Sequence, residues 1–169
     1  GAVSPPGGDL SDPVVQSTLR EVKVFWGLSA ELARARQFPA IDWNISYSLY
    51  ANLLSNEMKK VRSWILDKLS RATKVEQLAK IIGEESLPED EKELFSIGEL
   101  IKQAFLAQNA FDPKDEISPA EKTEAIARKL IEVDEKWKEQ IREGKKINEV
   151  KSKDISEVIK LKYDWGNKK

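Results

Sequence analysis

Apolar residues recur at helical spacing through most of the chain after residue 40. In two segments they follow one another by steps of three and four residues, which places each set on one face of a helix. The pattern predicts a bundle of helices near residues 45–69, 73–82, 88–107, 119–143 and 152–162. The two clearest apolar sets are Leu94, Ile97, Ile101 and Phe105, and Ile126, Leu130, Val133, Trp137 and Ile141.

Sequence signals at the ends of these segments suggest where the helices begin and stop. An S/T-x-x-E motif predicts a capping box, in which two side chains satisfy the free N–H groups of the first turn. The motif occurs at Thr73–Glu76, Ser86–Glu89 and Ser118–Glu121. Pro88 and Pro119 then fall in a first turn, where a missing N–H costs nothing. Gly144 is a natural stop for the fourth helix.

The first forty residues have a different character. Segment 1–13 is rich in proline and glycine, which predicts a loop. Residues 22–27 are β-branched and aromatic and predict a short strand, and Ser29 is suited to cap a short helix over residues 30–37. Since a lone strand is not stable without neighbours, we expect this part to be the edge of a larger sheet domain. The predicted fold is therefore mainly α, a C-terminal helical bundle preceded by a short α/β remnant.

Composition narrows the chemistry further. The chain has no Cys and no His, which excludes disulfides, thiolate catalysis, imidazole bases and the usual zinc sites, and we expect no metal site. Lys and Arg number 28 and Asp and Glu 29, so the net charge of −1 argues against a nucleic-acid partner. No stretch approaches the roughly 18 to 20 apolar residues that span a bilayer. We also expect no signal peptide, so any membrane link runs through partners.

No self-contained active site is visible in the sequence. Neither the G-x-x-x-x-G-K-[ST] phosphate loop nor G-x-G-x-x-G is present. Taken alone, Pro5–Asp9 is a surface turn and the acidic stretch 84–91 is a solvated helix start. Phe38 and Phe111 read as a packing residue and a loop anchor. The residues by themselves indicate a soluble, mainly helical domain broken from something larger.

Two blocks of sequence carry a more specific pattern. The first consists of Ser4–Val14, Val24–Leu28, Phe38–Trp43 and Ser46–Ser48, and the second of Ile82–Glu89 and Gln108–Asp112. The first block resembles S-P-P-G-G-D-F-S-[DE]-P-V, V-F-W-[AG]-L-D and F-P-[AS]-[IV]-N-W-x-x-S-Y-S. These motifs close the nucleotide-binding domain in the catalytic A subunit of A-type and vacuolar-type rotary ATPases. The second block is similar to I-V-G-x-x-A-L-P-E and Q-N-A-F-D of the same family.

Sister families fit less well. The F-type catalytic subunit reads Y-P-A-V-D-P-L where this chain has Phe38–Trp43, and the non-catalytic B subunit carries a Y-P-P-I-N segment. The sequence is therefore identified as similar to the C-terminal portion of the archaeal A-type catalytic A subunit.

The resemblance implies three groups of site residues. Phe38 and Phe111 would hold the adenine ring between them, with Pro39, Asn109 and Ala110 nearby. A loop near the neighbouring subunit would contain Pro6, Gly7, Gly8 and Asp9. Contact with the central rotor would involve Glu84, Glu85, Leu87, Pro88, Glu89, Asp90 and Glu91.

The resemblance also implies a division of the chain and a set of ligands. Residues 1–44 would be the edge of the nucleotide-binding α/β domain, 45–143 the helical bundle, and 144–169 a charged tail with a short helix. The ligands would be ATP or ADP with Mg²⁺. The phosphate loop and the magnesium ligands lie upstream of Gly1 in the family, so this chain alone is expected to be inactive.

In the complete complex the protein would synthesise or hydrolyse ATP, coupled to ion transport such as proton transport. Its partners would be the upstream part of the A subunit, the B subunit in an alternating six-membered ring, and the central stalk. It would be cytoplasmic and peripheral to the cell membrane. Two alternatives stay open: a non-catalytic helical assembly module that keeps the subunit contacts, and an unrelated helical adaptor. A helix over residues 14–28, with no strand, would favour the adaptor.

Overall fold

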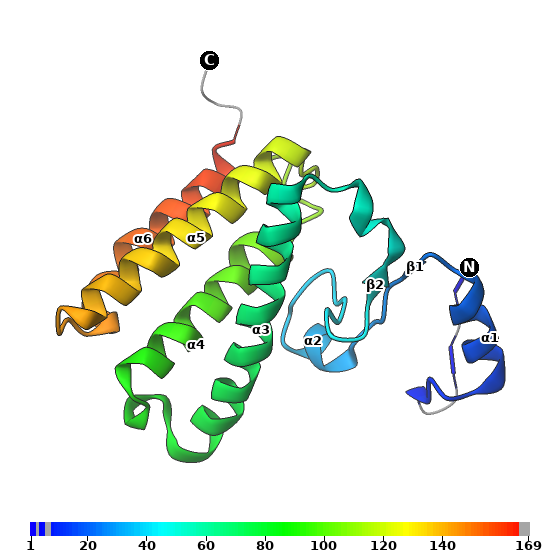
Figure 1. Ribbon diagram of the computed structural model, residues 1–169, viewed down its shortest axis with the longest axis horizontal. Coiled ribbons are helices and arrows are strands. Elements are labelled where there is room, and N and C mark those ends of the chain that lie inside the picture. The colour runs from blue at the N-terminus through cyan, green and yellow to red at the C-terminus, as the bar shows by residue number, and fades with distance from the viewer. Residues whose placement is uncertain (3, 6–7, 166–169) are drawn as a thin grey trace.

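The computed structural model describes residues 1–2, 4–5 and 8–165, and it is mainly helical (Figure 1). Helices and short strands alternate in the first part, and long helices follow. The first part contains α1 (Pro13–Glu21), β1 (Val24–Phe25), α2 (Ala30–Arg34), β2 (Tyr47–Ser48) and the 3-10 helix η2 (Leu49–Leu53). The second part contains α3 (Asn56–Ile82), the 3-10 turn η3 (Glu84–Ser86), α4 (Glu89–Ile101), the π-helix η4 (Lys102–Leu106), α5 (Ala120–Arg142) and α6 (Ile147–Tyr163).

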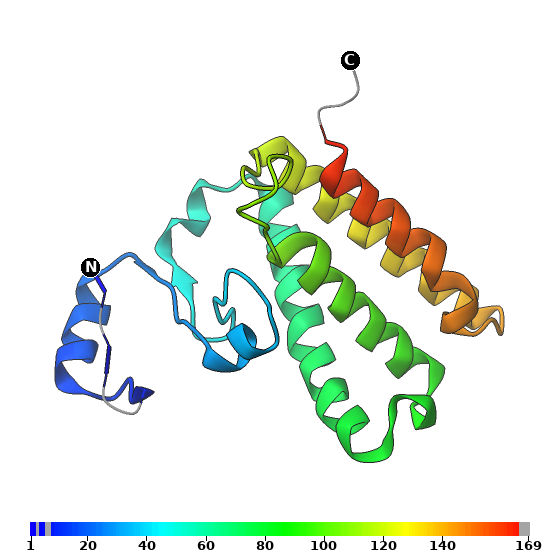
Figure 2. The same cartoon turned by 180° about the vertical axis from the view of Figure 1, so that it is seen from behind.

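The four long helices form the predicted bundle. Helices α3 and α4 make one antiparallel pair, and α5 and α6 make a second pair that lies against it (Figures 1 and 2). Both apolar sets seen in the sequence face the shared core, as predicted. Its most deeply buried apolar side chains, none more than 2% exposed, are Leu69, Ile97, Leu100, Ile101, Ala104, Ala127, Leu130, Val133, Trp137, Ile147 and Val158.

Several helix boundaries differ from the prediction. The expected break at Thr73 is wrong, because α3 runs through it and the Thr73 hydroxyl donates to the Leu69 carbonyl at 2.8 Å. The other two capping boxes do not form either. Pro88 and Pro119 occupy the N-cap positions themselves, and a proline has no side-chain acceptor. Gly144 does follow the end of α5 with φ +88°, as predicted for a helix stop.

The segment expected to be a charged tail with a short helix is largely a packed helix of the bundle. Helix α6 begins at Ile147 rather than near residue 152, and it lies against α5 and α4. Ile147 and Val158 belong to the main core. The alternating Lys and acidic residues of this segment concealed its apolar face.

A group of ionisable side chains, three of them buried, links three helices inside the bundle. Lys68 of α3 lies 2.5 Å from Asp134 of α5, and Lys138, one turn further along α5, lies 2.6 Å from the other oxygen of Asp134. Glu93 of α4 is buried beside them. Desolvation of this kind is tolerated only where opposite charges meet in good geometry.

The first part is a small α/β segment, as predicted. Strand β1 falls inside the expected strand and pairs antiparallel with β2, Val24 opposite Ser48 and Phe25 opposite Tyr47. Helix α1 was not expected. The Asp12 carboxylate caps it by accepting the N–H groups of Val14 and Val15. Since a strand is present, the condition set for an unrelated adaptor is not met.

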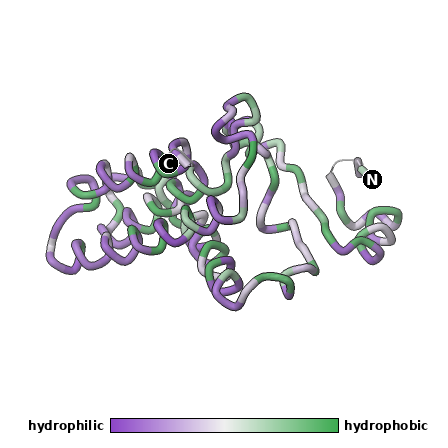
Figure 3. The backbone as a smooth tube through the Cα atoms, turned by 90° about the horizontal axis from the view of Figure 1, so that it is seen from above, coloured by the Kyte–Doolittle hydropathy of each residue, from purple (hydrophilic) through white to green (hydrophobic). Residues whose placement is uncertain are grey.

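Helix α1 stands away from the bundle in both views (Figures 1 and 2). It is tied to β2 through the Tyr47 hydroxyl, which donates to the Leu19 carbonyl at 2.7 Å. Hydrophobic residues run through this first part as well as through the bundle (Figure 3). Over the described ranges, no helix combines the length and apolarity needed to cross a membrane.

Candidate functional site

Two segments about seventy residues apart in sequence meet at one end of the bundle. The Gln108 backbone N–H donates to the Phe38 carbonyl oxygen at 2.8 Å. One residue earlier, the Gln37 side-chain amide lies 3.5 Å from the carbonyl oxygen of Lys102. The turn after α2 is thus docked on the π-helix η4 and on the loop that follows it. This contact brings Phe38 next to the segment that contains Asn109, Ala110 and Phe111.

The aromatic side chains at this junction are not used for internal packing. Phe38 is 55% exposed and Phe111 is 97% exposed. Pro39, joined to Phe38 by a cis peptide bond, is also exposed. Exposed aromatic rings held on two adjoining loops offer flat apolar surfaces to a planar ligand.

Local hydrogen bonds shape the loop that carries Phe111. The Asn109 side-chain oxygen accepts the Phe111 N–H at 3.0 Å, and the Asn109 carbonyl accepts the Asp112 N–H at 3.2 Å. The Asp112 carbonyl in turn accepts the N–H groups of Asp115 and Glu116. Asn and Asp favour such turns because their side chains bond to backbone two residues on. We call residues 109–111 the Phe111 turn.

A cluster of buried charges lies beneath the Phe111 turn, and we call Asp115, Lys122 and Lys162 the charge cluster. None of the three is more than 3% exposed. The Asp115 carboxylate accepts the Asn109 N–H at 2.8 Å and pairs with Lys122 at 3.2 Å and Lys162 at 3.1 Å. Sequence reasoning missed all three residues, because charged residues in polar stretches are normally solvated.

The environment of Asp115 keeps its carboxylate charged. Burial acts to raise the pKa, but the Asn109 N–H and the two lysines favour the ionised form more strongly. The pKa of Asp115 is therefore held below its ordinary value.

Residues 83–88 connect α3 to α4 at the opposite end of the bundle. We call this end, with the adjoining turns of the two helices, the tip; rotor contact was expected here. Glu85, Pro88 and Asp90 are exposed there, and Glu84 and Glu91 are partly exposed. The expectation that Leu87 contacts a partner does not fit, because its side chain is 3% exposed and packs in the core.

The Glu89 side chain is also bonded to other residues of this chain. Its carboxylate accepts the N–H of Ile147, the first residue of α6, at 2.9 Å, and it pairs with Lys92 at 3.0 Å. The pKa of Glu89 is lowered mainly by the hydrogen bond from the Ile147 N–H, and to a smaller extent by Lys92. Glu89 therefore fixes the start of α6 to the start of α4.

Apolar residues that sequence reasoning missed also face solvent at the tip. Ile81 is 81% exposed, and Leu78 and Ile82 of the same final turns of α3 are exposed as well, to a smaller degree. They lie outside the helical stripe that packs in the core. Beside them, Gly83 ends the helix with φ +86°, a conformation that favours glycine.

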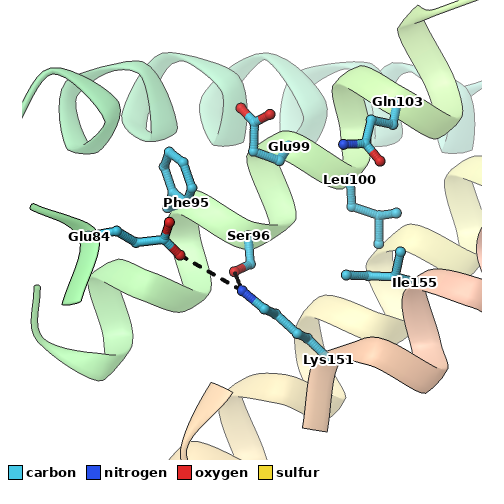
Figure 4. A pocket seen from close by; sticks show the side chains of 8 residues that line it. All are labelled: Glu84, Phe95, Ser96, Glu99, Leu100, Gln103, Lys151 and Ile155. Atoms are coloured by element: carbon cyan, nitrogen blue, oxygen red, sulfur yellow. Dashed lines mark hydrogen bonds and ion pairs between the residues drawn. The ribbon is translucent and has the colours of Figure 1, made fainter. Parts of the chain in front are cut away.

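A small pocket of about 170 Å³ opens between α4 and α6 near the tip. Figure 4 shows Lys151 reaching across it toward Glu84 and Ser96. The Lys151 Nζ lies 3.8 Å from the Glu84 carboxylate and 3.4 Å from the Ser96 hydroxyl. The charged groups satisfy one another, so the pocket offers no converging set of free polar atoms to a ligand.

The N-terminal loop expected near a neighbouring subunit is described only in part. Gly8 has φ +74°, and the Asp9 carboxylate accepts both the N–H and the hydroxyl of Ser11. The hydroxyl bond is the main reason that the pKa of Asp9 is lowered. Pro6 and Gly7 lie outside the described residues. In the described part of the chain no three acidic side chains are grouped to hold a metal ion.

Comparison with known families agrees with this architecture. The profile of the C-terminal domain of V and A type ATP synthase matches residues 48–151. The profile of the nucleotide-binding domain of the ATP synthase alpha/beta family matches residues 1–48. The boundary between the two falls at β2, where the small α/β segment gives way to the bundle.

Individual relatives agree with the two profile matches. The chain is 39% identical to the A subunit of the A-type ATP synthase of Pyrococcus abyssi, over 97% of its own length and 17% of the relative's. It is 37% identical to the corresponding protein of Thermococcus kodakarensis, covering 97% of this chain and 30% of the relative. It thus spans less than a third of the length of these curated relatives.

Among solved structures, one similar chain is described as a unique ATP synthase subunit, NeqB, from Nanoarcheaum equitans. Its TM-score is 0.67 at 25% identity, covering 76% of this chain and 32% of that one. Profile matches, relatives and fold agree along almost the whole sequence. The chain therefore belongs to the V- and A-type ATP synthase C-terminal domain family, and along its length it corresponds to the C-terminal portion of the A subunit.

Proposed function

We propose that this chain supplies the adenine-binding side of the nucleotide site, and the helical arm behind it, in the catalytic subunit of an A-type ATP synthase. The observation that carries the proposal is the hydrogen bond between the Gln108 N–H and the Phe38 carbonyl. It joins two loops that each present an exposed aromatic ring. Stacking of a base on an aromatic side chain contributes about 1–3 kcal/mol in nucleic-acid binders and needs no hydrogen-bond code.

The chemistry of phosphoryl transfer belongs to other parts of the complex. ATP or ADP would bind with Mg²⁺, whose ligands and the phosphate loop come from the upstream part of the A subunit. Catalysis of this kind depends on positioning and charge stabilisation of the phosphates. The chain alone is therefore expected to be inactive, and ion transport requires the complete peripheral membrane complex.

Exposed apolar side chains in the first part support assembly with that upstream part. Leu28 is 78% and Leu53 77% exposed, and Trp26 and Leu49 are exposed to a similar degree. Monomeric proteins rarely leave so much apolar surface uncovered in one region. The rest of the nucleotide-binding domain would cover it, and the loop at Gly8 and Asp9 would lie near the B subunit.

The tip of the bundle would meet the central rotor. Glu84, Glu85, Pro88, Asp90 and Glu91 remain candidates for that contact. The exposed apolar group of Leu78, Ile81 and Ile82 beside them adds surface for packing. Exposed ion pairs contribute little by themselves, so the apolar group would supply most of the contact energy.

Mutation of the two aromatic residues tests the adenine assignment. The full chain is combined with the upstream part and the B subunit, and the affinity for ADP with Mg²⁺ is measured by calorimetry. Phe111→Ala and Phe38→Ala should each weaken binding by about tenfold, as expected for loss of one stacking face.

Ile117→Ala is the matched control, because Ile117 is an exposed apolar residue of the same loop. Its affinity should equal that of the unmodified complex. Unchanged affinity in both Phe variants, with normal assembly, would contradict the adenine role and favour the alternative of a non-catalytic assembly module.

A further inference from the structure

We propose that Asp115 and Lys162 are positioning residues for the Phe111 turn, and that they make its placement depend on the docking of α6. The inference rests on the proposed role of Phe111 at the nucleotide. Neither residue would touch the ligand. Each would act through the backbone of the loop.

Asp115 joins three separate segments through one carboxylate. It accepts the backbone N–H of Asn109 at 2.8 Å, which fixes the first residue of the Phe111 turn. It also pairs with Lys122 of α5 and Lys162 of α6. Two helices therefore converge on the atom group that holds the turn.

Lys162 extends the same attachment to the segment before the turn. In addition to Asp115, its ammonium group donates to the carbonyl oxygens of Gln103 and Ala107, at 3.2 Å and 2.5 Å. The ammonium group therefore makes two hydrogen bonds to the backbone and one ion pair with Asp115. Gln103 belongs to η4 and Ala107 immediately follows it, so Lys162 holds the end of η4 from which the chain continues into the turn.

Apolar packing does not hold the turn. Asn109, Ala110 and Phe111 are all exposed, so hydrogen bonds must determine where the turn stands. The charge cluster is not needed to dock α6, which already buries Ile147 and Val158 in the core. Buried ion pairs seldom add net stability over apolar residues, and their best-attested use is to specify one arrangement. Here the arrangement specified is that of the turn.

The first test measures the turn in the full chain without nucleotide. Lys162→Met removes one buried charge but leaves Asp115 paired with Lys122, and Asp115→Asn leaves one oxygen for three donors. Amide hydrogen exchange over residues 108–112 should accelerate about tenfold or more in each variant, because a hydrogen bond to a charged group is lost.

Lys114→Met is the matched control. Lys114 lies in the same loop, but its side chain is exposed, and its single ion pair, at 3.8 Å, is with the partly exposed Asp164. Its exchange should match that of the unmodified chain. Exchange over residues 108–112 that is unchanged in both Lys162→Met and Asp115→Asn would overturn the proposal.

The second test separates positioning from stability. The double variant Asp115→Asn with Lys162→Met removes both charges of one pair and should recover part of the melting temperature lost by either single variant. Exchange over 108–112 should stay fast, and the affinity of the assembled complex for ADP with Mg²⁺ should stay about tenfold weaker. Recovery of affinity together with melting temperature would mean that the pair serves stability alone.

The two proposals fail in different ways. If Phe111→Ala leaves nucleotide affinity unchanged while Asp115→Asn still accelerates exchange, the adenine role is wrong and the positioning of the turn stands. If Phe111→Ala weakens binding while the charge-cluster variants change neither exchange nor affinity, only the positioning role is wrong.

Discussion

Glu93 shows how a single buried acid responds to its surroundings. Its side chain is 3% exposed and lies beside the Lys68–Asp134 pair. Burial, together with the neighbouring Asp134 carboxylate, raises the pKa of Glu93 to about 8, and Lys68 opposes this shift. The carboxyl group is thus largely protonated at neutral pH in the folded chain, whereas in the unfolded chain it would ionise near its ordinary value of 4.5.

This difference predicts a stability that falls with rising pH. Between about pH 4.5 and 8 the folded state holds a proton that the unfolded state has released, so raising the pH favours unfolding. The slope should approach about 1.4 kcal/mol per pH unit. Urea unfolding between pH 5 and 8.5 measures it, and Glu93→Gln should flatten the dependence.

Glu135→Gln, which alters an exposed acid next to Asp134 on α5, serves as the control and should leave the slope as it was. A slope that is the same in Glu93→Gln as in the unmodified chain would show that Glu93 ionises normally.

At the same scale, apolar residues were more predictable than buried charges. The spacing of Ile126, Leu130 and Val133 identified a core stripe because periodicity survives in the sequence. Nothing comparable marks Asp115 or Lys162, because their burial depends on partners more than forty residues away or in another helix. The aromatic residues were assigned a role only through family resemblance, since exposed rings have no periodic signature, and that assignment stays a prediction.

Helix pairing in the bundle depends on a close approach between α3 and α4. A β-carbon added at Gly98 would lie 2.4 Å from the β-carbon of Ala72, far inside contact distance. Gly98→Ala should therefore push the helices apart and destabilise the chain by about 1–3 kcal/mol, as overpacking does in other cores.

Urea unfolding gives the value, and the double variant Gly98→Ala with Ala72→Gly should restore most of the loss because it moves the methyl group across the contact. If the single variant unfolds at the same urea concentration as the unmodified chain, the helices do not approach as described.

Helices were predicted well where the capping motifs and the spacing of apolar residues agreed. At Thr73 they did not: the capping motif favoured a break, but Leu69, Ala72 and Val75 continue one buried stripe and keep α3 intact. Tertiary packing of an apolar face outweighs a local cap. Helix α1 was missed because it is only nine residues long and ends directly before the residues that predict the strand.

On the scale of the whole molecule, the first part and the bundle should respond differently to surface mutation. Leu28→Ser and Leu53→Ser alter side chains that are more than three-quarters exposed. Each should change the free energy of unfolding by no more than about 0.5 kcal/mol. Both should weaken binding to the upstream part of the catalytic chain, because that partner would cover these side chains.

Pull-down or calorimetric titration with the upstream part measures the association, and Ile81→Ser provides the comparison. Ile81 is equally exposed but lies at the tip of the bundle, so its substitution should leave this association intact. Normal association of both leucine variants would mean that another surface is used.

Helix α6 is attached at both ends to regions that lie far apart. Its first N–H is held by Glu89 at the tip, and Lys162 in its last turn holds the loop before Phe111. Seventeen residues of α-helix form a rod of roughly 25 Å. Because such a rod resists stretching and compression, the two attachment points keep a nearly constant separation. A displacement of one attachment point along the helix axis would therefore be transmitted to the other, without unfolding of any helix.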